Sequence, residues 1–170
     1  MIFNLFRKST APDAALEAYR SIVAQSRQPR FYAEWGVPDT VTGRFDMISL
    51  HMALTMRRLK GVAEAGEFTQ ALVDVFFRDM DHSIRELGVT DLGVPSKVKK
   101  MGNVFYGLAR TLSEALDSGN AADVEAVLVR NVYGAATSHA ATLAIYLLDE
   151  AARLAAEPVA AITHAQGAAA

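Results

Sequence analysis

Cysteine is absent from all 170 residues of the sequence. This absence excludes disulfide bonds, thiolate nucleophiles, and cysteine-ligated zinc and iron–sulfur sites. A chain of this length buries roughly 70% of the surface of its unfolded state, so apolar packing alone is enough to stabilise it. We therefore expect one ordinary domain with a hydrophobic core and no cross-link.

A large excess of charge is also missing, because 17 basic residues face 19 acidic ones and the net charge is −2. A protein that binds nucleic acid in general carries a clear basic footprint, so we expect no DNA partner. Small basic groups do occur at Arg57, Arg58 and Lys60 and at Lys97, Lys99 and Lys100. They are either simply solvated or contact phosphates, lipid headgroups or RNA.

Long apolar runs are missing as well. The longest uncharged stretch, between Arg130 and Asp149, holds too many polar residues to cross a bilayer. The first residues place apolar side chains before Arg7 and Lys8, which reverses the order of a secretory signal. We expect a cytoplasmic protein, and the apolar start leaves peripheral membrane contact open.

Apolar residues recur every three or four positions between the five prolines, which predicts helices rather than strands. The clearest stripe comprises Val98, Met101, Phe105, Leu108, Leu112 and Ala115, with Ser96 as the predicted N-cap and Gly119 as the predicted end. Further helices are predicted over 12–26, 45–59, 67–87, 121–132 and 138–156. The fold class is thus all-α, a compact single-domain bundle of about six helices. We expect an N-terminal arm (1–10), the helical domain (11–157) and an Ala-rich flexible tail (158–170).

An irregular stretch from Gln28 to Arg44 separates the first two predicted helices and contains Trp35, the only tryptophan. A loop this long is usually functional or packed down by its own side chains. The Trp35 ring either anchors the loop on the bundle or contacts a partner.

Catalytic signatures such as a P-loop, a nucleophile elbow or a zinc-protease motif do not occur in the sequence. Asp79, His82 and Glu86 share one helical face and are a candidate metal cluster, although a second Glu-x-x-His pair is missing. His51, on the most apolar helix, is either a haem ligand or a hydrogen-bonded core histidine. A small haem- or metal-binding enzyme is therefore the alternative function, while we expect no enzyme activity and no cofactor.

Several short segments in order resemble the ubiquinol-cytochrome c chaperone family. These segments are Trp35-Gly36-Val37-Pro38-Asp39-Thr40, Gly43-Arg44-Phe45-Asp46-Met47, Leu50-His51, Arg57-Arg58-Leu59-Lys60, Phe76-Phe77-Arg78-Asp79-Met80-Asp81, Arg85-Glu86-Leu87-Gly88-Val89, Val94-Pro95, Lys97, Lys99-Lys100-Met101 and Phe105-Tyr106-Gly107. They cover roughly residues 30–110, and the chain looks like a short bacterial member.

The resemblance implies an all-helical, non-enzymatic assembly chaperone for the respiratory cytochrome bc1 complex (complex III). It implies cytochrome b or another bc1 subunit as the client, and it leaves open a second assembly factor, the ribosome and a peripheral position at the inner membrane. A membrane-protein client calls for apolar contacts together with orienting charges. The residues predicted to supply them are Trp35, Arg44, Phe45, Asp46, Arg57, Arg58, Phe76, Phe77, Asp79, Met80, Asp81, Arg85, Glu86 and Phe105.

Overall fold

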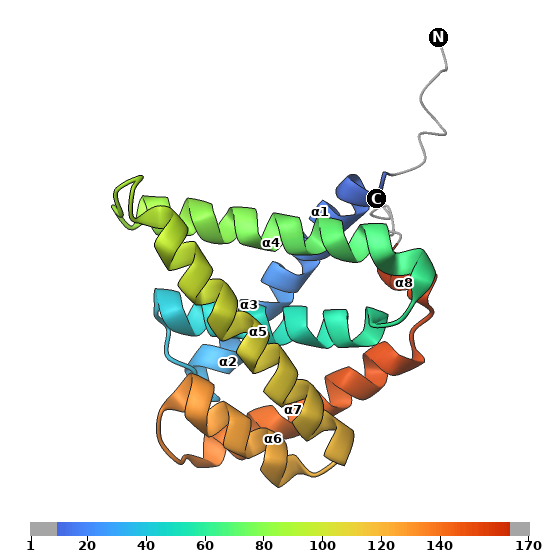
Figure 1. The fold of residues 1–170 in the computed structure, drawn as a ribbon. Helices are drawn as coiled ribbons and strands as arrows, with labels where there is room; N and C mark the ends of the chain where they lie inside the picture. The colour runs from blue at the N-terminus through green and yellow to red at the C-terminus, as the bar shows by residue number, and fades with distance from the viewer. Residues whose placement is uncertain (1–9, 164–170) are drawn as a thin grey trace.

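The computed structural model describes residues 10–163, and this part of the chain contains helices and no β-strand. The long helices are α1 (Ala11–Ser26), α3 (Val41–Leu59), α4 (Gly66–Glu86), α5 (Val94–Ser118), α6 (Ala121–Leu128) and α7 (Ser138–Ala156). Short segments are α2 (Pro29–Ala33), the 3₁₀ turn η1 (Ala63–Ala65), the π-helical turn η2 (Val129–Tyr133) and α8 (Val159–Thr163). The predicted all-α bundle is confirmed (Figure 1). Of the predicted N-terminal arm, residues 1–9 lie outside the described part of the chain.

Side-chain caps fix where several helices begin. Thr40 accepts a hydrogen bond from the Gly43 amide at the start of α3, and Thr137 caps α7 in the same way. The predicted Ser96 cap of α5 is wrong, because this helix already begins at Val94, with Pro95 in its first turn. Proline is tolerated there since the amides of the first turn have no partner inside the helix. The helix ends at Gly119 as predicted.

The predicted loop between residues 28 and 44 is shorter than expected, because it contains α2 and because α3 begins at Val41 rather than at Phe45. Trp35 packs edge-to-face on buried Phe31 at 5.3 Å, and its carbonyl accepts a hydrogen bond from the Tyr133 hydroxyl at 2.8 Å. These contacts confirm that Trp35 anchors the segment on the bundle.

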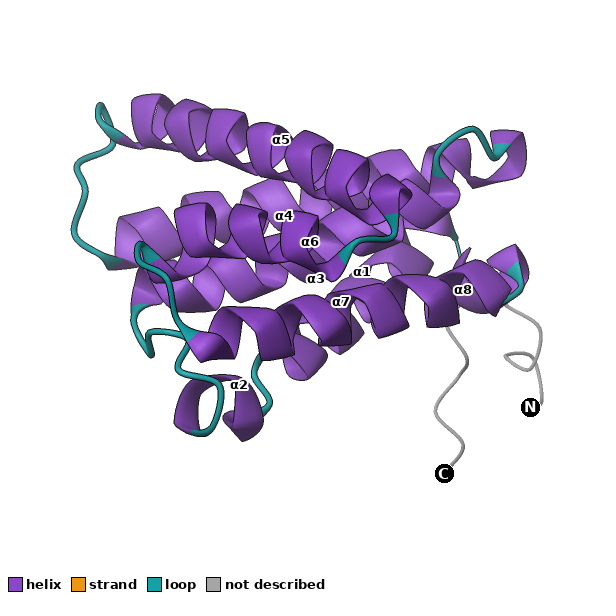
Figure 2. Ribbon diagram, turned by 90° about the horizontal axis from the view of Figure 1, so that it is seen from below, coloured by secondary structure: helices purple, strands orange, loops and turns teal. Residues whose placement is uncertain are grey.

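The core consists of two clusters of buried side chains that share helices α3 and α5. One cluster adds α6 and α7, and the other adds α1 and α4, so α3 runs through the middle of the bundle (Figure 2). Ile162 of α8 packs against both clusters, where a flexible tail was predicted to begin at residue 158. Residues 164–170 lie outside the described part of the chain. Among residues 10–163, none of the helices has both the length and the apolar character needed to cross a bilayer.

Candidate functional site

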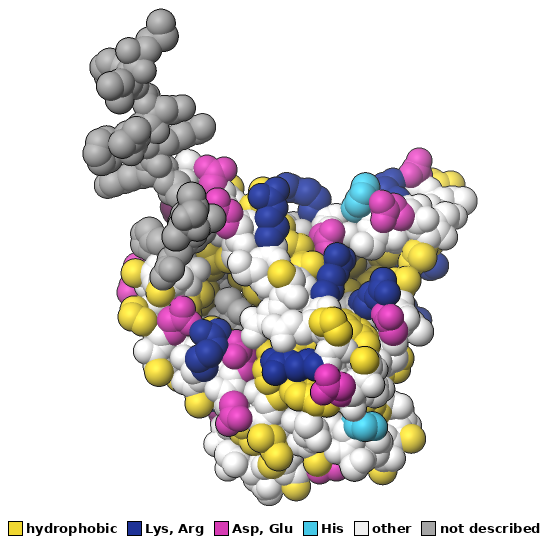
Figure 3. Space-filling model, turned by 180° about the vertical axis from the view of Figure 1, so that it is seen from behind, with side chains coloured by type: hydrophobic (Ala, Val, Ile, Leu, Met, Phe, Trp, Pro, Cys, Tyr) yellow, Lys and Arg dark blue, Asp and Glu magenta, His cyan; other side chains and the backbone are white. Residues whose placement is uncertain are grey.

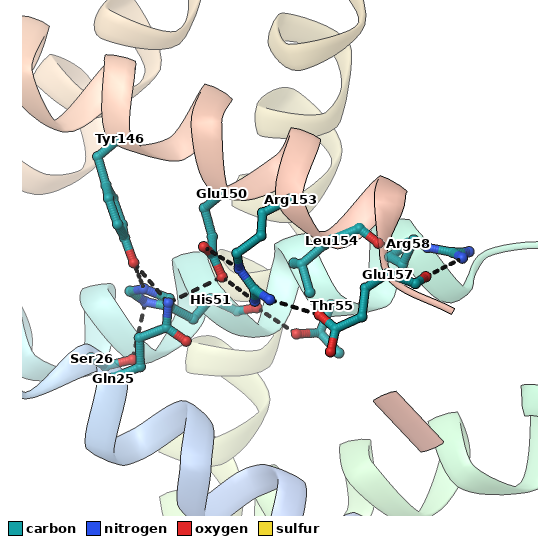
Figure 4. Close-up of polar contacts among 10 residues, drawn as sticks. All are labelled: Gln25, Ser26, His51, Thr55, Arg58, Tyr146, Glu150, Arg153, Leu154 and Glu157. Carbon is teal, nitrogen blue, oxygen red and sulfur yellow. Dashed lines mark hydrogen bonds and ion pairs between the residues drawn. The ribbon is translucent and has the colours of Figure 1, made fainter. Parts of the chain in front are cut away.

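His51 lies in the core, 3% exposed, at the centre of a polar cluster that joins α1, α3 and α7 (Figure 4). Its Nδ1 atom is 2.8 Å from the Met47 carbonyl oxygen, and its Nε2 atom is 2.8 Å from the Tyr146 hydroxyl. A carbonyl only accepts, so Nδ1 carries the proton and Nε2 accepts from Tyr146. Burial lowers the pKa of His51, which keeps the ring neutral. Both ring nitrogens are thus engaged within the chain, as expected of a core histidine rather than a haem ligand.

The cluster continues outward from Tyr146 toward the end of α7. The Gln25 amide donates to the Tyr146 hydroxyl at 2.9 Å and to Glu150 at 3.0 Å, while Glu150 pairs with Arg153 at 2.7 Å. Burial disfavours the charged form of Glu150, but the hydrogen bonds from Arg153 and Gln25 outweigh it and lower its pKa. A cavity of about 350 Å³, lined by both polar and apolar side chains, lies beside these residues. The polar groups of the cluster form hydrogen bonds with one another, and these bonds hold α1 and α7 on α3.

A larger groove of about 640 Å³ lies between α1 and α4, on the face shown in Figure 3. Its apolar side chains include Leu16, Val23 and Val75, and its exposed basic side chains are Arg20, Arg27 and Arg78. None of these three arginines has an ion-pair partner among residues 10–163. The groove therefore combines apolar surface with free positive charge.

Tyr19 of α1 and Asp79 of α4 also line this groove. The Tyr19 hydroxyl donates to the Asp79 carboxylate at 2.6 Å, and burial together with this hydrogen bond raises the pKa of Tyr19. His82 lies 3.2 Å from Glu86, one turn further along α4. Asp79 thus bonds to α1, and the described residues hold no group of three potential ligands that fits a metal ion.

Asp46 is a half-buried carboxyl on α3. Burial raises its pKa to about 7, and no hydrogen bond or ion pair joins its side chain to another described residue. Near neutral pH this carboxyl is consequently charged in only part of the molecules.

A family model described as ubiquinol-cytochrome C chaperone matches residues 33–169. The chain belongs to this chaperone family. The crystal structure of the Cbp3 homolog from Brucella abortus is similar, with 41% sequence identity, a TM-score of 0.85, and coverage of 97% of this chain and 94% of that one. The ubiquinol-cytochrome-c reductase complex assembly factor 1 of Xenopus laevis is 23% identical over 94 residues, which are 55% of this chain and 47% of the frog protein. The match thus spans about half the length of that curated relative.

The structure of this chaperone-family chain divides the predicted contact residues into buried and accessible ones. Phe76, Met80 and Phe105 are buried in the core, where the Phe76 and Phe105 rings lie 4.7 Å apart. They are not available to a partner at the surface. Phe45 and Phe77 are half-buried, and both pack on Phe76. Their ring centroids lie 5.8 and 5.6 Å from the centroid of the Phe76 ring.

Apart from Asp46, the predicted charged residues fall into two groups. Arg57 pairs with Asp117, Arg44 pairs with Asp39, and Arg58 donates to the Leu154 and Glu157 carbonyls at the end of α7 (Figure 4). These contacts tie chain segments together. On α4, Asp79, Asp81, Arg85 and Glu86 lie within two turns. Asp79 bonds to Tyr19 of α1, while Asp81 and Arg85 pair with each other at 2.7 Å.

The sequence analysis missed the α1 side of the groove. Arg20 and Arg27 are seven residues apart, so they lie on one face of a helix and both border the groove. This spacing is visible in the sequence. The spacing does not indicate, however, that this face of α1 lies beside Arg78 of α4.

Proposed function

We propose that this chain is a non-enzymatic assembly chaperone that binds newly made cytochrome b and promotes assembly of the respiratory cytochrome bc1 complex. The observation that carries the proposal is the family match over residues 33–169, because it spans most of the described helices. The name of the frog relative, an assembly factor of the ubiquinol-cytochrome-c reductase complex, points to the same process.

The client-binding surface that we propose is the groove between α1 and α4, together with the exposed part of α4 that carries Phe77, Asp81, Arg85 and Glu86. A membrane protein awaiting assembly exposes apolar segments and charged loops. The apolar side chains that line the groove suit the apolar segments, and the free guanidinium groups donate to carboxylates or backbone carbonyls of the charged loops. A chaperone for such a client works beside the inner membrane, so we place the chain peripherally there. A second assembly factor or the ribosome remains a proposed further partner.

The test uses a strain that lacks the gene for this chain. We expect the deletion to reduce assembled bc1 complex, measured by the cytochrome b spectrum and by ubiquinol oxidation. Wild-type protein restores both signals, while Arg20→Glu with Arg27→Glu restores little, because charge of the wrong sign then lines the groove. Arg110→Glu with Arg130→Glu is the matched control, since both side chains are exposed and lie outside the groove.

Pulse-labelled cytochrome b that co-purifies with the tagged chain identifies the client directly. Normal bc1 levels in the deletion strain would contradict the chaperone function itself. Full rescue by the groove variant would contradict only the location of the client-binding surface.

A further inference from the structure

The turn between α4 and α5, residues 87–93, carries the two most exposed large apolar side chains of the described residues, and we call it the α4–α5 tip. Leu92 is 96% exposed and Leu87 is 60% exposed. The tip projects at one edge of the bundle, at the upper left of Figure 1 and at the left of Figure 2. Burial of a leucine side chain is favourable, and these two side chains lack that contribution in the isolated chain.

Backbone hydrogen bonds within the turn and to the end of α4 order the tip. The amides of Gly93 and Val94 both donate to the Thr90 carbonyl, at 2.8 and 3.2 Å, and the Leu87 amide donates to Ser83. A turn whose amides already have partners loses less free energy when it leaves water. The tip is therefore an ordered apolar projection.

Charge around the tip is unbalanced toward positive. Residues 81–100 hold four basic side chains, Arg85, Lys97, Lys99 and Lys100, against three acidic ones, Asp81, Glu86 and Asp91, which gives a net charge of +1. Arg85 pairs with both Asp81 and Asp91. Lys97, Lys99 and Lys100 are exposed and have no ion-pair partner among residues 10–163. With a rise of about 1.5 Å per residue, these lysines lie within about 10 Å of the start of α5.

We infer that the α4–α5 tip docks on the surface of an anionic lipid bilayer. Leu87 and Leu92 enter the boundary between headgroups and acyl chains, and the three lysines contact the headgroups. Apolar side chains of interfacial proteins are buried about 5–10 Å deep, and lysines within about 10 Å of the start of α5 are close enough to the tip to reach the headgroups. Basic side chains are attracted to the negative surface potential of an anionic membrane, so the lysines supply the preference for anionic lipid.

The proposed function provides the setting for this inference, a client that resides in the membrane, but the binding itself requires no client. The test is flotation of the purified full chain with vesicles of phosphatidylcholine alone or mixed with phosphatidylglycerol. We expect flotation with the anionic vesicles and little with the neutral ones. Leu87→Ser with Leu92→Ser lowers the partition constant about tenfold or more, and Lys97→Glu with Lys99→Glu and Lys100→Glu removes the preference for anionic vesicles.

The control replaces two exposed apolar side chains elsewhere, Val41→Ser with Ile145→Ser, which are 54% and 55% exposed. It should bind like the wild type. Equal binding of the leucine variant and the wild type would overturn the inference, and so would loss of flotation only when residues 1–9 are deleted. Binding of RNA rather than anionic vesicles through the same lysines would also overturn it. Because flotation involves no bc1 subunit, its outcome is independent of the deletion-strain test.

Discussion

At the scale of single residues, the Tyr146 hydroxyl connects two parts of the buried polar cluster, because both His51 Nε2 and the Gln25 amide form hydrogen bonds with it. Tyr146→Phe leaves these two groups without that partner, so we expect the free energy of unfolding to fall by about 1–2 kcal/mol. Urea denaturation followed by circular dichroism measures the change. Tyr106→Phe is the control, since Tyr106 is an exposed residue, and its effect should stay within about 0.5 kcal/mol. Equal effects of the two substitutions would contradict a structural role for the cluster.

Asp46 gives a pH dependence of stability. Burial raises its pKa from 3.8 to about 7 in the folded chain, so the folded state binds the proton more tightly than the unfolded state. The stability from this group is complete below the unfolded pKa and is lost as the pH rises toward and through 7. Asp46→Asn removes the titration. We therefore expect the variant to be more stable than the wild type at pH 8, by on the order of 1 kcal/mol or about 2–4 °C in Tm.

At pH 4 the same comparison should show little difference, because the wild-type carboxyl is then protonated in the folded chain. Thermal unfolding of both proteins at the two pH values is the measurement. His51 titrates in the opposite sense, since its pKa is lowered, but it is present in both proteins and its effect cancels. A stability difference that is the same at both pH values would refute the assignment to Asp46.

Which aromatic side chains are buried could be predicted only in part. Adjacent residues on a helix point about 100° apart, so one of Phe76 and Phe77 is expected to be less buried than the other. The structure buries Phe76 and leaves Phe77 half-exposed. Met80 and Phe105 share the core with Phe76, and their burial depends on the packing of α4 on α5, which one-dimensional spacing does not contain.

At the scale of helices, periodicity predicted the six long ones within a few residues, because each presents an apolar stripe over several turns. It missed α2 and α8, which have five residues each and are too short for a stripe to repeat. It also missed the π-helical turn at Val129–Tyr133, where the ladder of hydrogen bonds changes register. The groove between α1 and α4 went unrecognised for a related reason, since it exists only once two helices are placed side by side.

Two helical glycines give opposite expectations. A Cβ atom on Gly43 would lie 1.9 Å from the Pro38 carbonyl oxygen, a backbone atom that cannot move without displacing the segment before α3. Gly43→Ala should therefore lower the free energy of unfolding by about 1–3 kcal/mol or more. Gly107 in α5 has open space around its Cα, so Gly107→Ala should raise it by about 0.5–1 kcal/mol through helix propensity. Chemical denaturation of the two variants tests the pair, and destabilisation by both would contradict this account of α5.

At the scale of the whole molecule, we expect the two core clusters to unfold together, because both include side chains of α3 and α5. Phe31, Leu143 and the half-buried Trp35 belong to the cluster with α6 and α7, while Phe76 belongs to the one with α1 and α4. Both clusters draw side chains from α3, where Leu50 faces the first and Met52 the second. Loss of either cluster exposes one side of α3, so unfolding of one half removes packing from the other.

This coupling predicts that a substitution that destabilises one cluster also lowers the stability of the other. Phe76→Ala should cost about 3–5 kcal/mol, because a large buried side chain is removed. The fluorescence of Trp35, which reports on the opposite cluster, should then shift its urea midpoint by the same amount as far-UV circular dichroism, since both follow one transition. If Trp35 fluorescence kept the wild-type midpoint while the dichroism moved, the clusters would unfold independently. Coincident midpoints mean that a partner bound in the groove between α1 and α4 stabilises the entire bundle, because free energy gained by one cluster is shared through α3.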